Sequence, residues 1–221
     1  SLGWALTLGA AVGVGLLAKY AMAFFPLCAG LAALMLPRAR IGWRDAGVAA
    51  LVAFAVVAPN IWWNIANGLT TLRHTAENAS LGAEAAGLQF DELLKFWGGQ
   101  FAVSGPILFA AYLAGLAGAR RDGTRAYLAL MSAPIFLALS AQAVRAEVNA
   151  NWAATGHVAA VLFGILVLRD RRRWLIASFA VNLAVTLALP LTTLVADRLR
   201  IGSGDLLLAR YVGRAEVSRR A

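Results

Sequence analysis

The sequence predicts an all-α integral membrane protein, a polytopic helical bundle of about seven membrane segments. Composition is the first reason: 61% of the 221 residues are hydrophobic and 14% are charged, whereas soluble domains average about 45–50% apolar and about 25% charged residues. The mean hydropathy is +0.71. The second reason is that long apolar runs recur along the whole chain, and the third is that short arginine-rich loops separate them.

The apolar runs have the length that membrane crossing requires. About 20 helical residues span about 30 Å of hydrocarbon. Residues 2–36 form one run broken only by Lys19. At about 1.5 Å per residue this run is too long for one straight crossing, so we expect two shorter helices, roughly 2–17 and 20–36. The other expected membrane helices are 46–65, 97–118, 126–143, 152–168 and 174–196.

The loops between these runs predict an orientation. Three short loops, 37–45, 119–125 and 169–173, contain ten of the twenty basic residues, all of them arginine. They alternate with the loops 66–95 and 144–151, in which acids balance the bases. Because basic residues concentrate in cytoplasmic loops, we expect the arginine loops on the cytoplasmic side of the membrane. The alternating loops are then periplasmic or external.

The composition also suggests how the chain is divided. We expect a transmembrane domain over residues 1–196 and an external tail over 197–221. Residues 203–221 have an amphipathic pattern, which suits either a helix on the membrane surface or the start of an incomplete soluble segment. The sequence begins without methionine and inside an apolar run, so we expect it to be a fragment of a longer membrane protein.

Several function classes are excluded by what the sequence contains. A net charge of +9 would suggest nucleic-acid binding in a soluble protein, but here the arginines lie in short loops between membrane segments. There is no G-x-G-x-x-G motif opening a helix and no P-loop motif. The single cysteine, Cys28, excludes an internal disulfide and is expected to pack in an apolar segment. His74 and His157 are too dispersed for a metal site, and we expect His157 to be a polar packing residue.

Lys19 is the most informative single residue, because an ionisable group in a membrane segment is costly and marks a functional candidate. It precedes Pro37 by eighteen residues, about 27 Å along a helix, which places it near the external interface. Two interpretations are open: Lys19 contacts an anionic group such as a lipid phosphate, or its ammonium extends to bulk headgroups. Tyr20 beside it is either a second phosphate donor or an interface anchor.

Other polar and aromatic residues gather on the same predicted external side. Tryptophan rings stack on sugars, while amides and charged groups bond hydroxyls and phosphates. The pattern suits a cavity for a glycolipid, a transporter vestibule, or solvated loops with helix caps. The candidate sugar- or acceptor-binding residues are Asn60, Trp63, Asn64, Arg73, His74, Asn78, Gln100, Asn151 and Trp152.

Four blocks in this order carry a resemblance to a known family. They are GLLAKYAMAFFPL (15–27), APNIWWNIANGLTTLRHTAENA (58–79), FWGGQFAVSGPILFA (96–110) and VNANWAA (148–154). The chain resembles bacterial family-39 glycosyltransferases, relatives of dolichyl-phosphate-mannose protein mannosyltransferases and of aminoarabinose lipid A transferases. The segment DLLLARYVGR (205–214) is similar to the start of the family's final soluble stretch.

The resemblance implies a GT-C membrane fold and a specific chemistry. Such enzymes move a sugar from a polyprenyl-phosphate donor to a glycan, lipid or protein acceptor on the external face, and they invert the anomeric carbon. Lys19 matches the lysine of the family's "KY" block and is expected at the donor phosphate, with Tyr20. We therefore expect membrane lipids, a polyprenyl-phosphate sugar and the acceptor as partners, and we expect no cofactor, no metal and no nucleic acid; any protein partner is unknown. The resemblance to bacterial enzymes implies a place in the bacterial inner membrane, with the site on the periplasmic side.

Some positions depart from the family pattern. The acidic motif that carries the family's general base would lie upstream of residue 1, so we expect no catalytic residue in this chain and no activity from it alone. Thr155, His157 and Arg214 stand where proline, tyrosine and tryptophan are expected. The alternative is a non-enzymatic membrane protein, either a lipid-linked sugar transporter or an accessory subunit of a larger complex.

Overall fold

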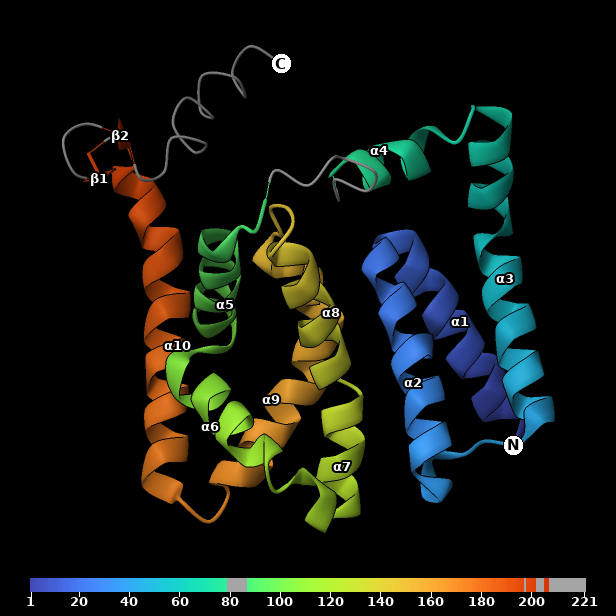
Figure 1. Ribbon diagram of the computed structural model, residues 1–221, viewed down its shortest axis with the longest axis horizontal. Coiled ribbons are helices and arrows are strands. Elements are labelled where there is room, and N and C mark those ends of the chain that lie inside the picture. Colours follow the sequence, from blue (N-terminus) through green and yellow to red (C-terminus); the bar gives the residue numbers. More distant parts are fainter. Residues whose placement is uncertain (79–86, 197, 202–204, 207–221) are drawn as a thin grey trace. The chain divides into compact units, whose positions relative to one another are not determined.

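The computed structural model describes residues 1–78, 87–196, 198–201 and 205–206 (Figure 1). The chain forms two compact units, residues 1–171 and 172–221. The predicted boundary at residue 196 separates a membrane domain from an external tail, whereas these two units are defined by their internal packing. The predicted boundary therefore stays a prediction.

The first apolar run is interrupted where the sequence predicts. Helix α1 (Leu2–Ala18) ends before Lys19, whose backbone is extended (φ −160°, ψ 127°). The chain then makes a 3₁₀ turn, η1 (Tyr20–Ala23), and continues as α2 (Phe24–Met35). A second 3₁₀ turn, η2 (Pro37–Ala39), follows. The prediction of two helices, 2–17 and 20–36, is therefore confirmed to within a few residues at each end.

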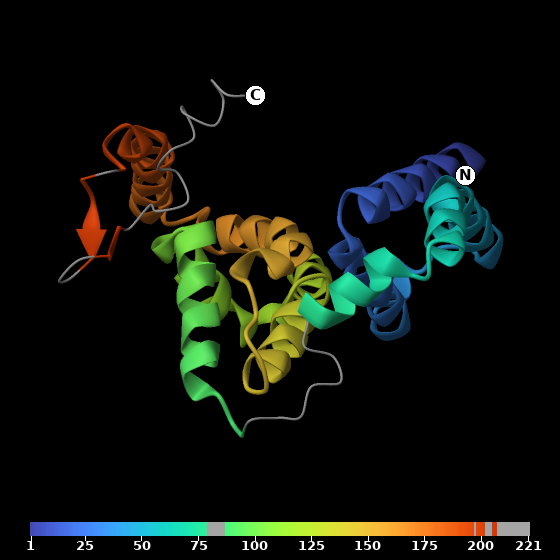
Figure 2. The same ribbon diagram turned by 90° about the horizontal axis from the view of Figure 1, so that it is seen from above.

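Helix α3 (Trp43–Ala66) packs along α1, and both views show the two helices side by side (Figures 1 and 2). Two glycines on α1 make the close approach possible. A Cβ atom at Gly9 would lie 2.8 Å from Val52 Cβ, and one at Gly13 would lie 2.7 Å from Val56 Cβ. Small residues four positions apart allow helix backbones to approach closely in membranes.

Residues 66–95, expected to be a loop, contain a helix. Gly68 and Leu69 have positive φ angles of 69° and 60° and turn the chain at the end of α3. Helix α4 (Thr70–Asn78) follows. It is polar and amphipathic, so no apolar run indicates it, and the prediction of an irregular loop here was wrong.

The run 97–118 is not one straight helix. Helices α5 (Phe90–Ser104) and α6 (Pro106–Leu116) meet at an angle of 113°. Gly105 lies between them with φ 82°, a conformation that residues with a Cβ atom rarely adopt. Pro106 then starts α6 with its fixed φ, so the Gly-Pro pair produces the bend.

The remaining helices of the first unit surround an aromatic core. After the turn η3 (Ala119–Arg121) come α7 (Gly123–Leu130) and α8 (Ala133–Ala143), and after the turn η4 (Ala150–Ala153) comes α9 (Ala154–Leu168). Buried aromatic rings from α6, α8 and α9 pack together at centroid distances of 5.5–5.7 Å around Phe109 and Tyr112. The core members are Phe96, Phe109, Tyr112, Phe136 and Phe163.

The second unit consists of a long apolar helix and a short strand pair. Helix α10 (Arg172–Thr192) continues into the turn η5 (Thr193–Val195). Strand β1 (Arg200–Ile201) pairs antiparallel with β2 (Asp205–Leu206). Most of the predicted amphipathic segment 203–221 lies outside the described residues.

The structure is that of an all-α membrane protein. In the described part, four helical segments are long and apolar enough to cross a membrane, or five if α5 and α6 form one broken span: 43–66, 123–143, 150–168 and 172–195. The prediction of about seven segments counted α1 and α2, which have only 17 and 12 residues, about 25 and 18 Å. Large apolar side chains such as Leu51, Phe54 and Leu183 are exposed, as lipid-facing residues are.

Candidate functional site

A cavity of about 440 Å³ opens at the helix break around Lys19. Residues from η1, α2, α4, α8 and η4 line it, so five segments distant in sequence meet there. Its lining is mostly apolar, with one ammonium group and a few neutral polar groups. The lining residues are Lys19, Tyr20, Ala21, Ala23, Phe24, Leu27, Thr75, Leu139, Gln142 and Trp152.

Lys19 reaches across to η4. Its Nζ donates a hydrogen bond of 2.6 Å to the carbonyl oxygen of Asn151. An ammonium has three N–H donors, and this carbonyl takes one of them. Because Lys19 is exposed and lines the cavity, the other two donors are accessible to an anionic ligand.

The hydroxyl of Thr155, at the start of α9, makes a second bond close to the one from Lys19. It donates to the carbonyl oxygen of Ala21 in η1 at 2.9 Å. Two side-chain hydrogen bonds thus attach the segment 19–21 to the neighbouring stretch 151–155: Lys19 bonds to η4, and Thr155 at the start of α9 bonds to η1. This pairing fixes the position of the lysine relative to Trp152.

The two predicted asparagines of α3 connect η1 to the start of α4. Tyr20 donates its hydroxyl to Asn60 Oδ1 at 3.1 Å, and Asn64 Nδ2 donates to the Asn60 carbonyl oxygen at 3.0 Å. Asn64 Oδ1 accepts from the backbone N–H of Thr71 at 3.1 Å. Asn64 is 2% exposed, and its amide makes hydrogen bonds within the protein. Its assignment to sugar binding stays a prediction.

Gln100 belongs to a buried hydrogen-bond network that does not line the cavity. Its Oε1 lies 2.8 Å from His157 Nε2, and His157 Nδ1 lies 2.7 Å from the hydroxyl of Ser104. A carbonyl oxygen only accepts, so His157 donates from Nε2 and accepts at Nδ1 from Ser104. Gln100 Nε2 donates to the Ala150 carbonyl oxygen at 3.4 Å. His157 is therefore a polar packing residue, as predicted. The hydrogen-bond network connects α5 and α9 to η4.

The structure brings together only part of the predicted site. Lys19, Tyr20 and Trp152 line the cavity, and Asn60, Asn64 and Asn151 bond to its lining or lie behind it. Trp63 is 50% exposed, and Arg73 and His74 are exposed on α4; none of the three lines the cavity. Asn78 ends α4, and its side chain lies outside the described residues.

Two polar residues of the cavity were not among the predicted site residues. Thr75 lies one turn along α4 from Thr71, in the polar stretch that was treated as a loop. Gln142 lies near the end of the apolar run 126–143. A lone amide in an apolar run is the signal that could have identified it, by the same reasoning as for Lys19.

The described residues contain no group of three His, Cys, Asp or Glu side chains that could hold a metal ion. Within the same part of the chain, no carboxylate lines the cavity at Lys19. The arrangement can bind an anion beside an aromatic ring and an apolar surface, as an amphiphile with a phosphate headgroup would require.

Fold and site together define an all-α membrane protein with a mostly apolar cavity that contains one ammonium group. The chain is similar to the lipid A galacturonosyltransferase RgtD of Rhizobium johnstonii, with 38% identity over 225 residues. The match covers all of this chain and 47% of that protein, so the chain spans about half the length of this relative. No family model matches the sequence, and no solved structure is significantly similar.

Proposed function

We propose that this chain is part of a membrane glycosyltransferase that takes a sugar from a polyprenyl-phosphate donor and transfers it to an acceptor on the periplasmic face of the bacterial inner membrane. The observation that carries the proposal is the cavity in which Lys19 lies beside Trp152 and an apolar wall. The similarity to a lipid A galacturonosyltransferase supports it, and so does the family resemblance of the four sequence blocks.

The donor side of the reaction follows from the lining. A polyprenyl phosphate has an anionic headgroup and an apolar chain. The ammonium of Lys19 pairs with the phosphate, while Phe24, Leu27 and Leu139 offer apolar contact to the first isoprene units. When the bond from the sugar to the phosphate breaks, negative charge grows on the departing phosphate, and a fixed cation stabilises it more strongly in the transition state than in the ground state.

The acceptor side is proposed from similarity. The relative's name specifies lipid A and a galacturonosyl group, and we propose the same acceptor class and sugar here. Inversion at the anomeric carbon requires a base that takes the acceptor hydroxyl's proton. Because no carboxylate lines the cavity in the described part of the chain, we assign to these residues donor binding and leaving-group stabilisation rather than base catalysis.

Replacing Lys19 by alanine tests the proposal in the full enzyme. We expect kcat/KM for a polyprenyl-phosphate sugar to fall about 100-fold, which corresponds to about 2.7 kcal/mol. Lys19→Arg should retain part of the activity because it keeps the charge. Lys95→Ala is the matched control, since Lys95 is the only other lysine and is exposed on α5, where it pairs with Asp91 and Glu92 at 3.1 and 2.6 Å.

Transfer of galacturonate to lipid A would be followed by mass spectrometry of the lipid product. Equal activity of Lys19→Ala and Lys95→Ala would refute the role of Lys19 in donor binding. Absence of transfer from any polyprenyl-phosphate sugar, with the parent enzyme folded, would refute the proposed reaction itself.

A further inference from the structure

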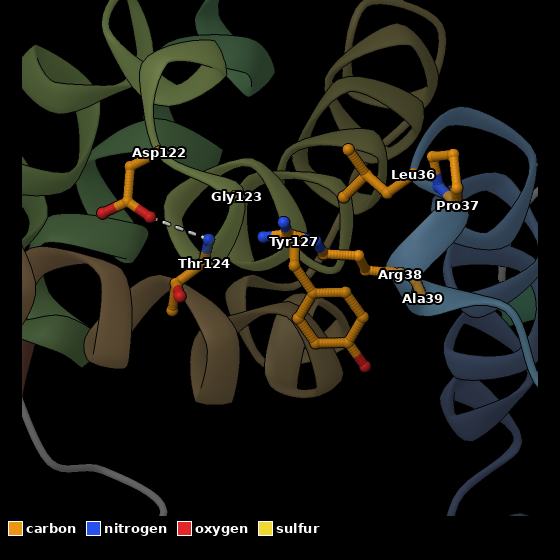
Figure 3. A pocket seen from close by; sticks show the side chains of 8 residues that line it. All are labelled: Leu36, Pro37, Arg38, Ala39, Asp122, Gly123, Thr124 and Tyr127. Carbon is orange, nitrogen blue, oxygen red and sulfur yellow. Dashed lines mark hydrogen bonds between the residues drawn. The ribbon is translucent and has the colours of Figure 1, made fainter.

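A second and larger cavity, of about 760 Å³, lies at the opposite end of the helices that bound the Lys19 cavity. Helix α2 begins at the Lys19 cavity with Phe24 and ends beside the second cavity at Leu36. The segment 123–143 likewise runs from the second cavity to the first, at Gln142. The residues that line the second cavity are Leu36, Pro37, Arg38, Ala39, Asp122, Gly123, Thr124 and Tyr127 (Figure 3).

Two charged side chains line this cavity, Arg38 and Asp122, and in the described part of the chain only the carboxylate has partners. Asp122 accepts from the backbone N–H of Thr124 at 2.9 Å and lies 3.8 Å from Arg125 Nε, so its carboxylate is already compensated. Arg38 is exposed, and its side chain makes no hydrogen bond or ion pair within the described part of the chain. In Figure 3 its side chain extends from η2 toward the first turn of α7. An uncompensated guanidinium therefore faces the cavity.

The walls around this guanidinium are apolar, from Leu36, Pro37, Ala39 and the ring of Tyr127. Their position at the ends of α2 and of the segment 123–143 places them at the depth where hydrocarbon meets headgroups. The neighbouring turns add the exposed Arg120 and Arg121. A cation at this depth attracts anionic lipid. Each basic residue near the surface raises the affinity for an anionic membrane about fivefold.

We propose that this cavity binds the phosphate headgroup of an anionic phospholipid in the leaflet predicted to be cytoplasmic, with Arg38 as the phosphate ligand and Tyr127 against the glycerol and upper acyl chain. A guanidinium suits this role because its planar N–H donors match two phosphate oxygens at once. The site is separate from the Lys19 cavity, and the proposal does not depend on glycosyl transfer.

The test is lipid binding to the full chain in detergent, measured by native mass spectrometry with short-chain phosphatidylglycerol and phosphatidylcholine. Both lipids carry a phosphate, but only phosphatidylglycerol has a net negative charge. We expect one phosphatidylglycerol to bind at least fivefold more tightly than phosphatidylcholine. Arg38→Gln should weaken the binding of phosphatidylglycerol at least fivefold. Since the Arg38 side chain has no partner to lose among the described residues, this variant should remain folded.

Arg171→Gln is the matched control, because Arg171 is exposed, lies in another arginine loop of the same predicted side and does not line the cavity. It should leave the affinity within twofold. Thr124→Trp places a large ring in the cavity without changing its charge, and it should weaken phosphatidylglycerol binding as well. Equal effects of Arg38→Gln and Arg171→Gln would mean a diffuse charge effect and would overturn the proposal. Displacement of the lipid by equimolar inorganic phosphate would overturn the lipid assignment.

Discussion

The contact between α1 and α3 depends on two glycines. Replacing Gly9 by alanine measures how much this close contact contributes to the free energy of unfolding. An added Cβ would clash with the carbonyl oxygen of Ala49 and lie 2.8 Å from Val52 Cβ. Because a carbonyl oxygen belongs to the backbone, no side-chain rotation relieves this clash, and the helices must move apart. Overpacking of this kind costs about 1–3 kcal/mol. The better helix propensity of alanine returns about 1 kcal/mol, so we expect a net loss of up to about 2 kcal/mol in the free energy of unfolding.

The same helix supplies the control. A Cβ at Gly3 would meet nothing within 4 Å, so Gly3→Ala should be neutral or stabilising by up to about 1 kcal/mol. Unfolding in mixed micelles of increasing denaturing-detergent content, followed by circular dichroism, compares the two variants with the parent. Equal stability of Gly9→Ala and Gly3→Ala would refute the reasoning, because it would mean that α1 and α3 do not pack at this distance. Since α1 leads directly to Lys19, Gly9→Ala should also weaken donor binding.

Two further predictions concern the polar bonds behind the cavity. His157→Phe keeps the ring but removes the donor to Gln100 Oε1 and the acceptor of the Ser104 hydroxyl, so it should lower the free energy of unfolding by about 2–3 kcal/mol; an unchanged denaturation midpoint would contradict this. Tyr20→Phe removes the part-buried bond to Asn60 and should cost about 0.5–1.5 kcal/mol. It should reduce donor affinity less than Lys19→Ala does, and an equal or greater reduction, measured as KM, would instead make Tyr20 a phosphate ligand.

The fold was predictable wherever composition controls it. A charged residue cannot remain in the middle of an apolar crossing without cost, so the position of Lys19 in the sequence was enough to indicate the break between α1 and α2. By contrast, α4 is a polar helix on which Thr71 and Thr75 serve as contacts, and a search for apolar runs does not detect such a helix. The bend at Gly105 was missed because the residues on both sides are apolar, although a Gly-Pro pair is a local turn signal.

The site was predictable in its residue types but not in its membership. Lys19, Tyr20 and Trp152 were selected because cations and aromatics at an interface attract phosphates and sugars, and the cavity contains all three. Gln100 has the same polar character, yet it is fully buried and bonds to His157. Whether such an amide binds a ligand or bonds within the protein depends on its neighbours in the folded structure. For Gln100 these neighbours come from segments about fifty residues away in the sequence.

By itself, the sequence determined that this protein lies in a membrane as a helical bundle with a cation at the end of its first helix, because hydrophobicity and the cost of burying charge act residue by residue. Only the tertiary structure decided that Lys19 meets Asn151, that Thr75 and Gln142 join it, and that Arg38 faces a second cavity near Tyr127. The physical reason is that hydrogen bonds and cavities depend on distances of a few ångströms between segments far apart in the chain, and helix packing sets those distances.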